Sequence, residues 1–481
     1  MTRVRMRIKL AYGMGAMAYG VKDNGFSVFL LIFYNQVIGL PANLVGLAVM
    51  IALIIDAFID PVIGHLSDRT NTRWGRRHPW LYASVIPVAF SWFLLWHPPA
   101  LEDQTLVLLY LIGSAILVRS AIAMSEVPSI ALLPELTRDY HERTDVLRYR
   151  FLFGWIGGLA LLWLAYAVFL APTADQPAGL LRREGYDAYA LTGAAIMVVA
   201  ILIAAIGTHK RMARPPAKLP ERKPLKAELK AIFGTLRNRA FLTLMAAGVF
   251  AYANQGLNFA TSTYMQGYVW EFPAWAFSAW PVTLLVGVVF AFLAAPVVSR
   301  RFGKKQGAAL TAGLAVLVGM APYVLRLLGI FPENGDPLTI PLFFAFVTAA
   351  TGLGICPMIL TGSMLADVIE DSEMRTGYRE EGLFFAGNLF MQKCVTGIGT
   401  FAAGSLITMV GFPQNAVPGA VDPAVIDRLI LVFVILTALF VTAAIAMFLR
   451  YPLGEDDHNS RIATLAAREN GLAAQSPSGL G

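Results

Sequence analysis

Two aspartates interrupt an otherwise apolar stretch of the chain, GLAVMIALIIDAFIDPVIG from Gly46 to Gly64. Residues four apart share a helix face, so Asp56, Asp60 and Asp68 form one stripe if this stretch is helical. An ionisable group inside a membrane costs several kcal/mol unless it faces a cavity and has a partner. We therefore expect Asp56 and Asp60 to face inward and Asp68 to reach water. Close carboxylates repel, which suits them to take up a proton or a metal ion.

The composition places these aspartates in a membrane protein. Of 481 residues, 57% are hydrophobic and 14% are charged, against roughly 25% charged in soluble proteins. Crossing a bilayer takes about 20 apolar residues. The sequence predicts an all-α protein with twelve transmembrane helices, near 10–36, 44–66, 79–97, 105–134, 148–171, 188–208, 240–270, 277–298, 307–330, 340–366, 383–410 and 426–449.

Lysine and arginine set the expected orientation, because cytoplasmic loops are enriched in both. The basic segments all fall on one side of twelve crossings, which predicts cytoplasmic N and C termini in a multi-pass protein of the cell (inner) membrane. The predicted organisation is a six-helix bundle (1–208), a basic cytoplasmic linker (209–237), a second six-helix bundle (238–450) and a cytoplasmic tail (451–481).

An internal repeat supports two pseudo-symmetric bundles. TRWGRR, from Thr72 to Arg77, returns as RRFGKK from Arg300 to Lys305, an offset of 228. LPELTRDYHERT, from Leu133 to Thr144, returns as LADVIEDSEMRT from Leu365 to Thr376, an offset of 232. Parallel repeats around a midplane site are the architecture of many secondary transporters.

Other classes of function find no support in the sequence. It shows no metal-ligand cluster, phosphate loop or nucleophile elbow, so we expect no enzyme activity and no cofactor. Both cysteines, Cys356 and Cys394, lie in predicted spans, which leaves no disulfide framework. The net charge of +7 lies in the predicted cytoplasmic segments and does not indicate a nucleic-acid partner.

The motif Asp-x-x-x-Asp-Pro-x-x-Gly-x-x-x-Asp-Arg-Thr, from Asp56 to Thr70, followed by RWGRRHPW, resembles the glycoside–pentoside–hexuronide:cation symporters. These form the melibiose-permease branch of the major facilitator superfamily. YGVKDNG, EVPSIALLPELTRDYHERT and ADVIEDSEMRTGYREEGLFFAGNLFMQK agree with the resemblance, in order along the chain. It implies cation-coupled symport of a small-molecule solute by alternating access. We expect a monomer in contact with membrane lipid.

The resemblance implies that Asp56, Asp60 and Glu126 bind the coupling cation and that Lys393 supplies a positive charge from the opposite bundle. A structural alternative is a fixed ion-pair core, because Arg119 lies seven residues before Glu126 on the same helix face. The family's sodium-binding asparagine and threonine are replaced by Ile59 and Ala123. Losing two oxygen ligands disfavours Na⁺ more than H⁺. We therefore predict proton coupling, with a Na⁺ site at Asp56, Asp60 and Glu126 as the alternative.

The expected solute site keeps its polar anchors but not its aromatic ones. The polar positions implied by the resemblance are Lys22, Asp23, Arg150 and Asn388, whereas the aromatic positions are Ile130 and Met358. Sugar C–H faces stack on aromatic rings, so this argues against a melibiose-like disaccharide. We expect a small polar or glycosidic solute. The alternatives are a transporter of an amphipathic solute, such as a lysolipid, and a receptor that binds its solute without transporting it.

Charged residues at helix ends are predicted gate elements. Arginines can pair with carboxylates and helix C-termini at a closed inner face, and the candidates are Asp68, Arg69, Arg73, Gly75 and Arg76. The pairs Asp139/Arg143 and Asp371/Arg375 have the four-residue spacing of helical ion pairs. We interpret Arg77, Lys304 and Lys305 as topology signals alone.

Overall fold

The computed structural model describes residues 4–137, 140–173, 176, 178–212, 234–235, 238–376 and 381–453. The described residues form a helical fold. The β-type pairing among them is one isolated bridge, between Thr72 and Gly75. The first long helix is built from five consecutive segments: α1 (Met6–Met14), α2 (Ala16–Asn24), η1 (Gly25–Phe29), α3 (Leu30–Ile32) and η2 (Phe33–Val37).

The remaining long helices of the first half are α4 (Ala42–Arg69), α5 (His78–Trp96), α6 (Gln104–Leu136), α7 (Tyr140–Leu164), continued by η3 (Ala165–Phe169), and α8 (Arg183–Met212). Those of the second half are α10 (Arg239–Tyr264), continued by η6 (Met265–Val269), α11 (Ala274–Phe302), α12 (Lys304–Leu327), α13 (Thr339–Thr376), α14 (Glu381–Met409) and α15 (Pro423–Leu449).

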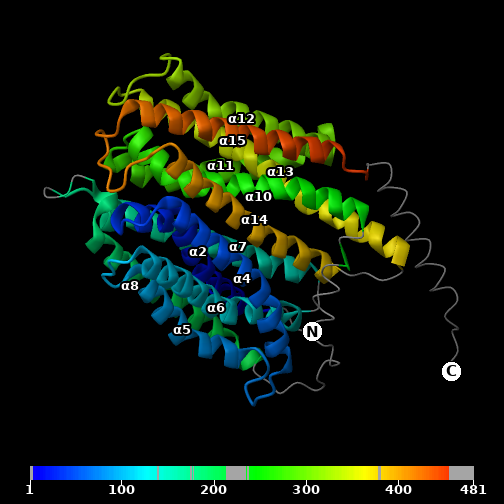
Figure 1. The fold of residues 1–481 in the computed structure, drawn as a ribbon. Helices are drawn as coiled ribbons and strands as arrows, with labels where there is room; N and C mark the ends of the chain where they lie inside the picture. Colours follow the sequence, from blue (N-terminus) through cyan, green and yellow to red (C-terminus); the bar gives the residue numbers. More distant parts are fainter. Residues whose placement is uncertain are drawn as a thin grey trace, which may run out of the picture.

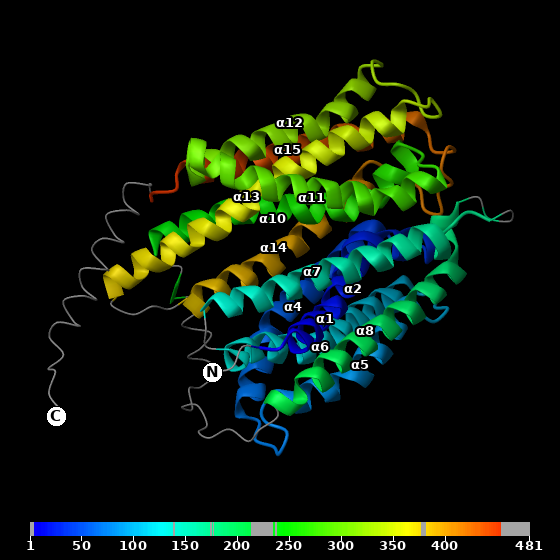
Figure 2. The same ribbon diagram turned by 180° about the vertical axis from the view of Figure 1, so that it is seen from behind.

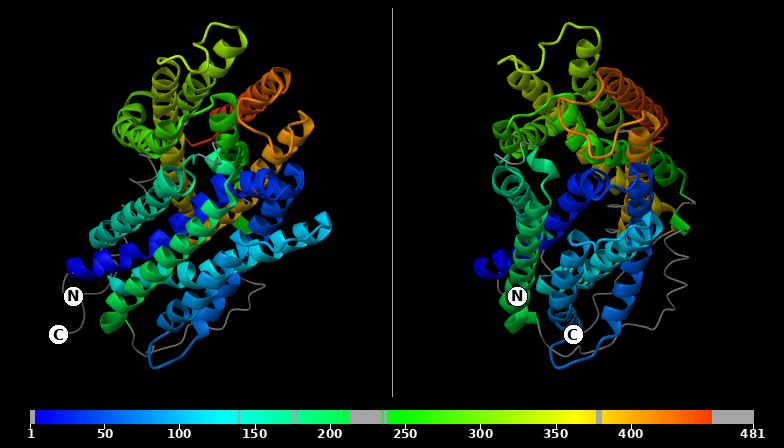
Figure 3. Two further views of the ribbon diagram at one scale, coloured as in Figure 1. Left: turned by 90° about the vertical axis from the view of Figure 1, so that its left-hand side faces the viewer. Right: turned by 60° about the vertical axis from the view of Figure 1, so that its left-hand side comes forward.

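The helices α1–α8 gather in one group and α10–α15 in another, with their axes running roughly the same way (Figure 1, Figure 2). The views from the side show the same separation (Figure 3). We call the face where α1 begins and α15 ends the terminal face, and the opposite face, where η2 and η6 end, the distal face. The boundaries of the predicted bundles stay predictions.

In the described part of the chain, ten helices are long and apolar enough to cross a membrane. The other two predicted spans, near 10–36 and 383–410, correspond to the short segments from Met6 to Val37 and to α14, which carries Lys393. The chain is thus a helical multi-pass membrane protein. The count of twelve crossings and the cytoplasmic position of the termini stay predictions.

The repeat is visible in the backbone at the distal face. The π-helical turns η2 and η6 are offset by 232 residues, as are the prolines Pro41 and Pro273 that precede α4 and α11. The amide of Leu40 donates to the Tyr34 carbonyl at 2.9 Å, and the amide of Phe272 donates to the Gln266 carbonyl at the same distance. The sequence offset therefore describes a repeated structure.

Small residues let α4 and α14 approach closely across the two groups. A methyl group added to Gly404 would lie 2.2 Å from the Ala42 carbonyl oxygen, and one on Gly46 would lie 2.9 Å from the Phe401 backbone. Such small-residue contacts let membrane helices approach closely. This contact brings Asp60 on α4 and Lys393 on α14 together.

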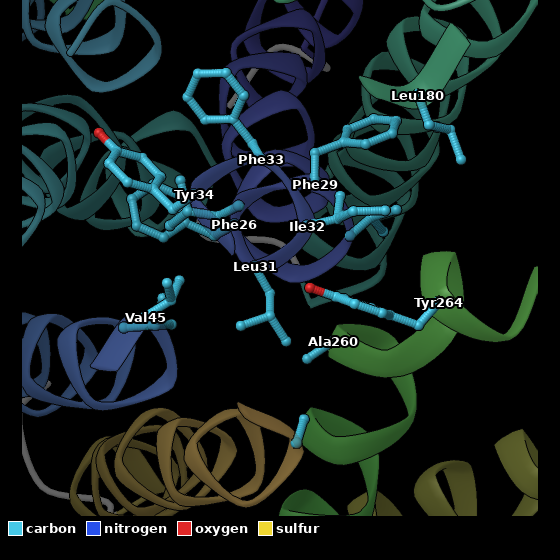
Figure 4. Close-up of a cluster of buried hydrophobic side chains, with 14 of the residues drawn as sticks. Phe26, Phe29, Leu31, Ile32, Phe33, Tyr34, Val45, Leu180, Ala260 and Tyr264 are labelled. Carbon is cyan, nitrogen blue, oxygen red and sulfur yellow. The ribbon is translucent and has the colours of Figure 1, made fainter. Parts of the chain in front are cut away.

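A buried apolar cluster joins the first helix to its neighbours. Phe26, Leu31 and Tyr34 are each at most 2% exposed, and Ala260 and Tyr264 of α10 are equally buried. Figure 4 shows Leu31 between Val45 of α4 and the α10 side chains. The first helix therefore forms part of the junction between the two groups.

Candidate functional site

Lys393 lies between the two aspartates of α4. Its Nζ is 3.0 Å from Asp56 Oδ2 and 2.5 Å from Asp60 Oδ2. Arg119 of α6 approaches the same Asp56 oxygen at 2.9 Å. Asp56 and Arg119 are 2% and 4% exposed, whereas the Asp60 side chain is 30% exposed. Asp56 is thus enclosed by two cations, and Asp60 is the aspartate with access to solvent.

Glu126 has a different cationic neighbour from the one the sequence suggested. Its carboxylate lies 3.9 Å from Arg150 Nη2, and Arg150 Nη1 donates to Ser129 Oγ at 2.9 Å. Arg119, expected as its partner from their common helix face, instead pairs with Asp56. The seven-residue spacing placed both side chains on one face but did not decide which carboxylate the guanidinium reaches.

The expected solute residues border this set. Lys22 is 3% exposed, lies 4.1 Å above the Tyr19 ring and interacts electrostatically with Asp23, Glu126 and Asp56. Asp23 itself is exposed, and Asn388 of α14 lies beside the Tyr252 hydroxyl of α10.

Ile130 is 46% exposed and Met358 is 45% exposed, on α6 and α13 respectively. The charged residues expected to bind solute or cation form, together with Arg119, one charge cluster that joins the first half to Lys393 of the second half. It combines four acids with four bases: Asp23, Asp56, Asp60, Glu126, Lys22, Arg119, Arg150 and Lys393.

Each half has an equivalent ion pair near the terminal face. Arg76 Nη2 lies 2.8 Å from Glu135 Oε1, and Lys304 Nζ lies 2.7 Å from Asp367 Oδ1. Arg76 and Lys304 are related by the 228 offset, and Glu135 and Asp367 by the 232 offset. The basic member lies at or just before the start of one helix, and the acidic member lies toward the end of the next, so each pair joins two consecutive helices of the same half.

The interpretation of Arg77 and Lys304 as topology signals was incomplete. Lys304 holds Asp367, while Arg77 is 7% exposed, pairs with Asp68 and donates to Ser67 Oγ at 2.7 Å. A basic residue that only sets topology would not need to be buried. The sequence signal for these ion pairs is the acid that the repeat preserves at Glu135 and Asp367.

The other predicted gate residues have varied surroundings. Gly75 has φ +83° in the turn that Thr72 bridges, Arg73 stacks near Trp74, and Arg69 is exposed. Asp371 is 7% exposed and accepts from Asn238 Nδ2 at 3.3 Å. Asp139 and the side chains of Arg143 and Arg375 lie outside the described residues, so the two Asp–Arg pairs stay predictions.

A buried polar network joins the two halves at the distal face. Tyr264 donates to Asn35 Oδ1 at 2.7 Å, and Gln36 Nε2 donates to the Pro413 carbonyl at 3.0 Å. The Ala416 amide donates back to Gln36 Oε1 at 2.8 Å. The sequence analysis missed this network, although two adjacent amides in the apolar run FYNQVIGL were a signal for it.

The family described as MFS/sugar transport protein matches residues 11–455. The chain belongs to this family. The resemblance to the glycoside–pentoside–hexuronide:cation symporters is confirmed, and the chain is a transporter-family protein and not an enzyme.

The relatives and solved structures agree with this assignment. The chain is 26% identical to the uncharacterized symporter sll1374 of Synechocystis sp., covering 97% of this chain and 98% of that one. It is also 26% identical to the putative glycoside/cation symporter YagG of Escherichia coli, covering 86% and 85%. The inward-open xylose transporter XylE of E. coli superimposes with a TM-score of 0.62 at 15% identity, covering 95% and 99%.

Proposed function

We propose that this transporter couples inward proton movement to the symport of a small polar or glycosidic solute by alternating access. The observation that carries the proposal is the position of Lys393, whose ammonium lies between Asp56 and Asp60 and comes from the other half of the molecule. A proton on Asp60 weakens this link between the halves, so protonation and rocking of the halves become coupled.

The side chains around the aspartates favour a proton over sodium. Na⁺ needs several oxygen ligands, but Ile59 and Ala123 offer none from their side chains, and two cations already lie against Asp56. A proton needs one acceptor with access to water. Asp60, with a side chain 30% exposed, meets that requirement.

The distribution of burial supports an inward-facing arrangement. The distal face is closed by buried hydrogen bonds between the halves, whereas Asp23, in the middle of the first helix, is exposed. Inside a membrane protein an exposed carboxylate faces a water-filled cavity, because contact with lipid is too costly. We infer that this cavity opens toward the terminal face, which is predicted to be cytoplasmic because its loops are basic.

A transport assay with purified protein in liposomes tests the coupling. A thermal-stabilisation screen of glycosides, uronates, nucleosides and lysolipids first selects a solute, and its uptake is then driven by an inward proton gradient or an inward sodium gradient. We expect uptake to follow the proton gradient and to collapse with a protonophore. Asp60→Asn should lose the gradient dependence, while Asp187→Asn, an acid far from the cluster, should keep it.

Two outcomes would contradict the proposal. Stimulation by sodium at constant pH, with no proton entry, would assign the aspartates to a sodium site. A solute that stabilises the protein but is neither taken up nor exchanged would indicate a receptor.

A further inference from the structure

A cavity of about 210 Å³ lies at the distal face, away from the charge cluster. Both halves line it: the end of the first helix, η3 and the segment around Leu180 on one side, and η6, the start of α11 and the turn at Val417 on the other. Its wall is mainly apolar and aromatic, and its rings are Tyr166, Tyr268, Phe272 and Phe277. An apolar cavity of about 150 Å³ accommodates benzene, so this one has room for a ring with a small substituent.

Among the described residues that line the cavity, Glu271 alone carries a charge. Its side chain is exposed and forms no ion pair in the described part of the chain. Arg326 attracts it from a distance, but the Arg326 guanidinium donates to Asn334 Oδ1 at 2.8 Å and lies 5.3 Å above the Trp270 ring. The cavity therefore has a negative rim whose charge forms no ion pair among the described residues.

The backbone at Glu271 adds an independent argument. Its φ is +43°, in the left-handed region, and the residue related to it by the 232 offset is Gly39, with φ +90°. A side chain at such a position carries a conformational cost that glycine avoids. The second half thus has a carboxylate at the position where the first half has glycine. Strained backbone of this kind is common at functional sites, which supports a functional role for the Glu271 side chain.

The geometry points to a binding site for a small organic monovalent cation, a quaternary ammonium or protonated amine with one aromatic or aliphatic group. The apolar body would occupy the cavity, and the cation would lie near Glu271 and the faces of the aromatic side chains, where cation–π attraction adds to the charge. The wall comes from both halves, so a bound molecule holds the distal face closed. A bound cation would therefore slow solute uptake without competing with the solute. This effect on uptake rests on the proposed function.

Binding of benzyltrimethylammonium to the purified full-length protein, measured by isothermal titration calorimetry, tests the site without requiring transport. Glu271→Gln should weaken binding on the order of fivefold, as expected for a partly exposed ion pair. Benzyl alcohol, which has the ring but no charge, should bind both proteins equally. Glu102→Gln, an exposed acid on the distal side of the first half, should not change either affinity.

A second variant tests the cavity itself. A methyl group on Gly267 would lie 3.5 Å from the Leu180 side chain, an ordinary contact, so Gly267→Ala should fold and reduce the cavity. It should weaken the binding of both compounds. Equal affinity of the wild type and Glu271→Gln for the ammonium, or displacement of the ammonium by the transported solute, would overturn the site. Loss of proton coupling would leave these binding results unchanged and would refute only the proposed function.

Discussion

Lys393 on α14 lies 2.5 Å from Asp60 on α4, and this ion pair joins the two halves of the molecule. The carboxylates of the cluster all belong to the first half, whereas Lys393 belongs to the second. A change in the charge of Asp60 therefore acts directly on the contact between the halves. Asp56 and Asp60 of the apolar helix α4 thus both have a charged partner in the other half.

The pair can be measured with a double-mutant cycle. Breaking a buried ion pair costs about 3–5 kcal/mol, and because Arg119 still holds Asp56 and Asp60 is partly exposed, we expect Lys393→Met to cost about 2 kcal/mol. Lys393→Met/Asp60→Asn should be no less stable than Lys393→Met alone, since the unpaired charge is removed. Thermal unfolding in detergent compares Lys393→Met, Asp60→Asn and the double variant with the wild type. Additive losses would show that the two side chains act independently.

Substitutions of Asp23 and Arg150 should differ in their effects on solute binding and on proton uptake. Asp23 is exposed beside the cluster, so Asp23→Asn should abolish solute binding and leave proton uptake by the solute-free protein intact. Arg150 lies 3.9 Å from Glu126, so Arg150→Ala should reduce both. Calorimetry with the selected solute and proton release measured with a pH dye separate the two effects. Solute binding by both variants at wild-type affinity would place the solute site elsewhere.

The repeated ion pairs at the terminal face, Arg76–Glu135 and Lys304–Asp367, should contribute unequally to the stability of the protein. The Asp367 side chain is 8% exposed and Lys304 reaches both its oxygens, at 2.7 and 2.8 Å, whereas the Glu135 side chain is 29% exposed. Removing a buried charged partner costs more than removing an exposed one. Asp367→Asn should therefore destabilise by about 2 kcal/mol and Glu135→Gln by less than about 1 kcal/mol. Equal melting temperatures for the two variants would contradict this ranking.

Removing the Tyr264 hydroxyl should favour opening of the distal face. Tyr264→Phe loses one hydrogen bond between the halves, worth about 1 kcal/mol, which corresponds to roughly a fivefold change in the open population. A cysteine at Ala260, which is 1% exposed, should then react faster with a reagent added at the distal side. Tyr110→Phe is the control, because that hydroxyl donates to the Leu94 carbonyl within the first half. The same labelling rate in both variants would exclude Tyr264 from the gate.

Relief of backbone strain should be measurable at Glu271. Glu271→Gly removes a side chain from the left-handed region at φ +43°, and we expect a gain of about 1 kcal/mol in stability. Asn415→Gly, at φ +52°, should gain less, because asparagine tolerates this region better than glutamate. Thermal unfolding compares the two with the wild type. A loss of stability in Glu271→Gly would show that the carboxylate contributes more to the fold than its backbone conformation costs.

The sequence determined the class of the protein because a bilayer constrains the length and polarity of each segment that crosses it. Each apolar stretch has to be helical and about 20 residues long, so the long helices could be predicted without contacts. The inward placement of Asp56 and Asp60 followed from the cost of charge in lipid. The family followed from local motifs such as that from Asp56 to Thr70.

Tertiary structure decided which charges meet. Helical periodicity places Arg119 and Glu126 on one face, but the approach of α4 to α6 brings the guanidinium to Asp56. The Lys393 contacts depend on the small residues between α4 and α14, which act over more than 300 positions of sequence separation. The distal network and the Glu271 cavity likewise arise where the ends of the two halves meet. Such contacts are set by the packing of whole helices, which local sequence patterns do not specify.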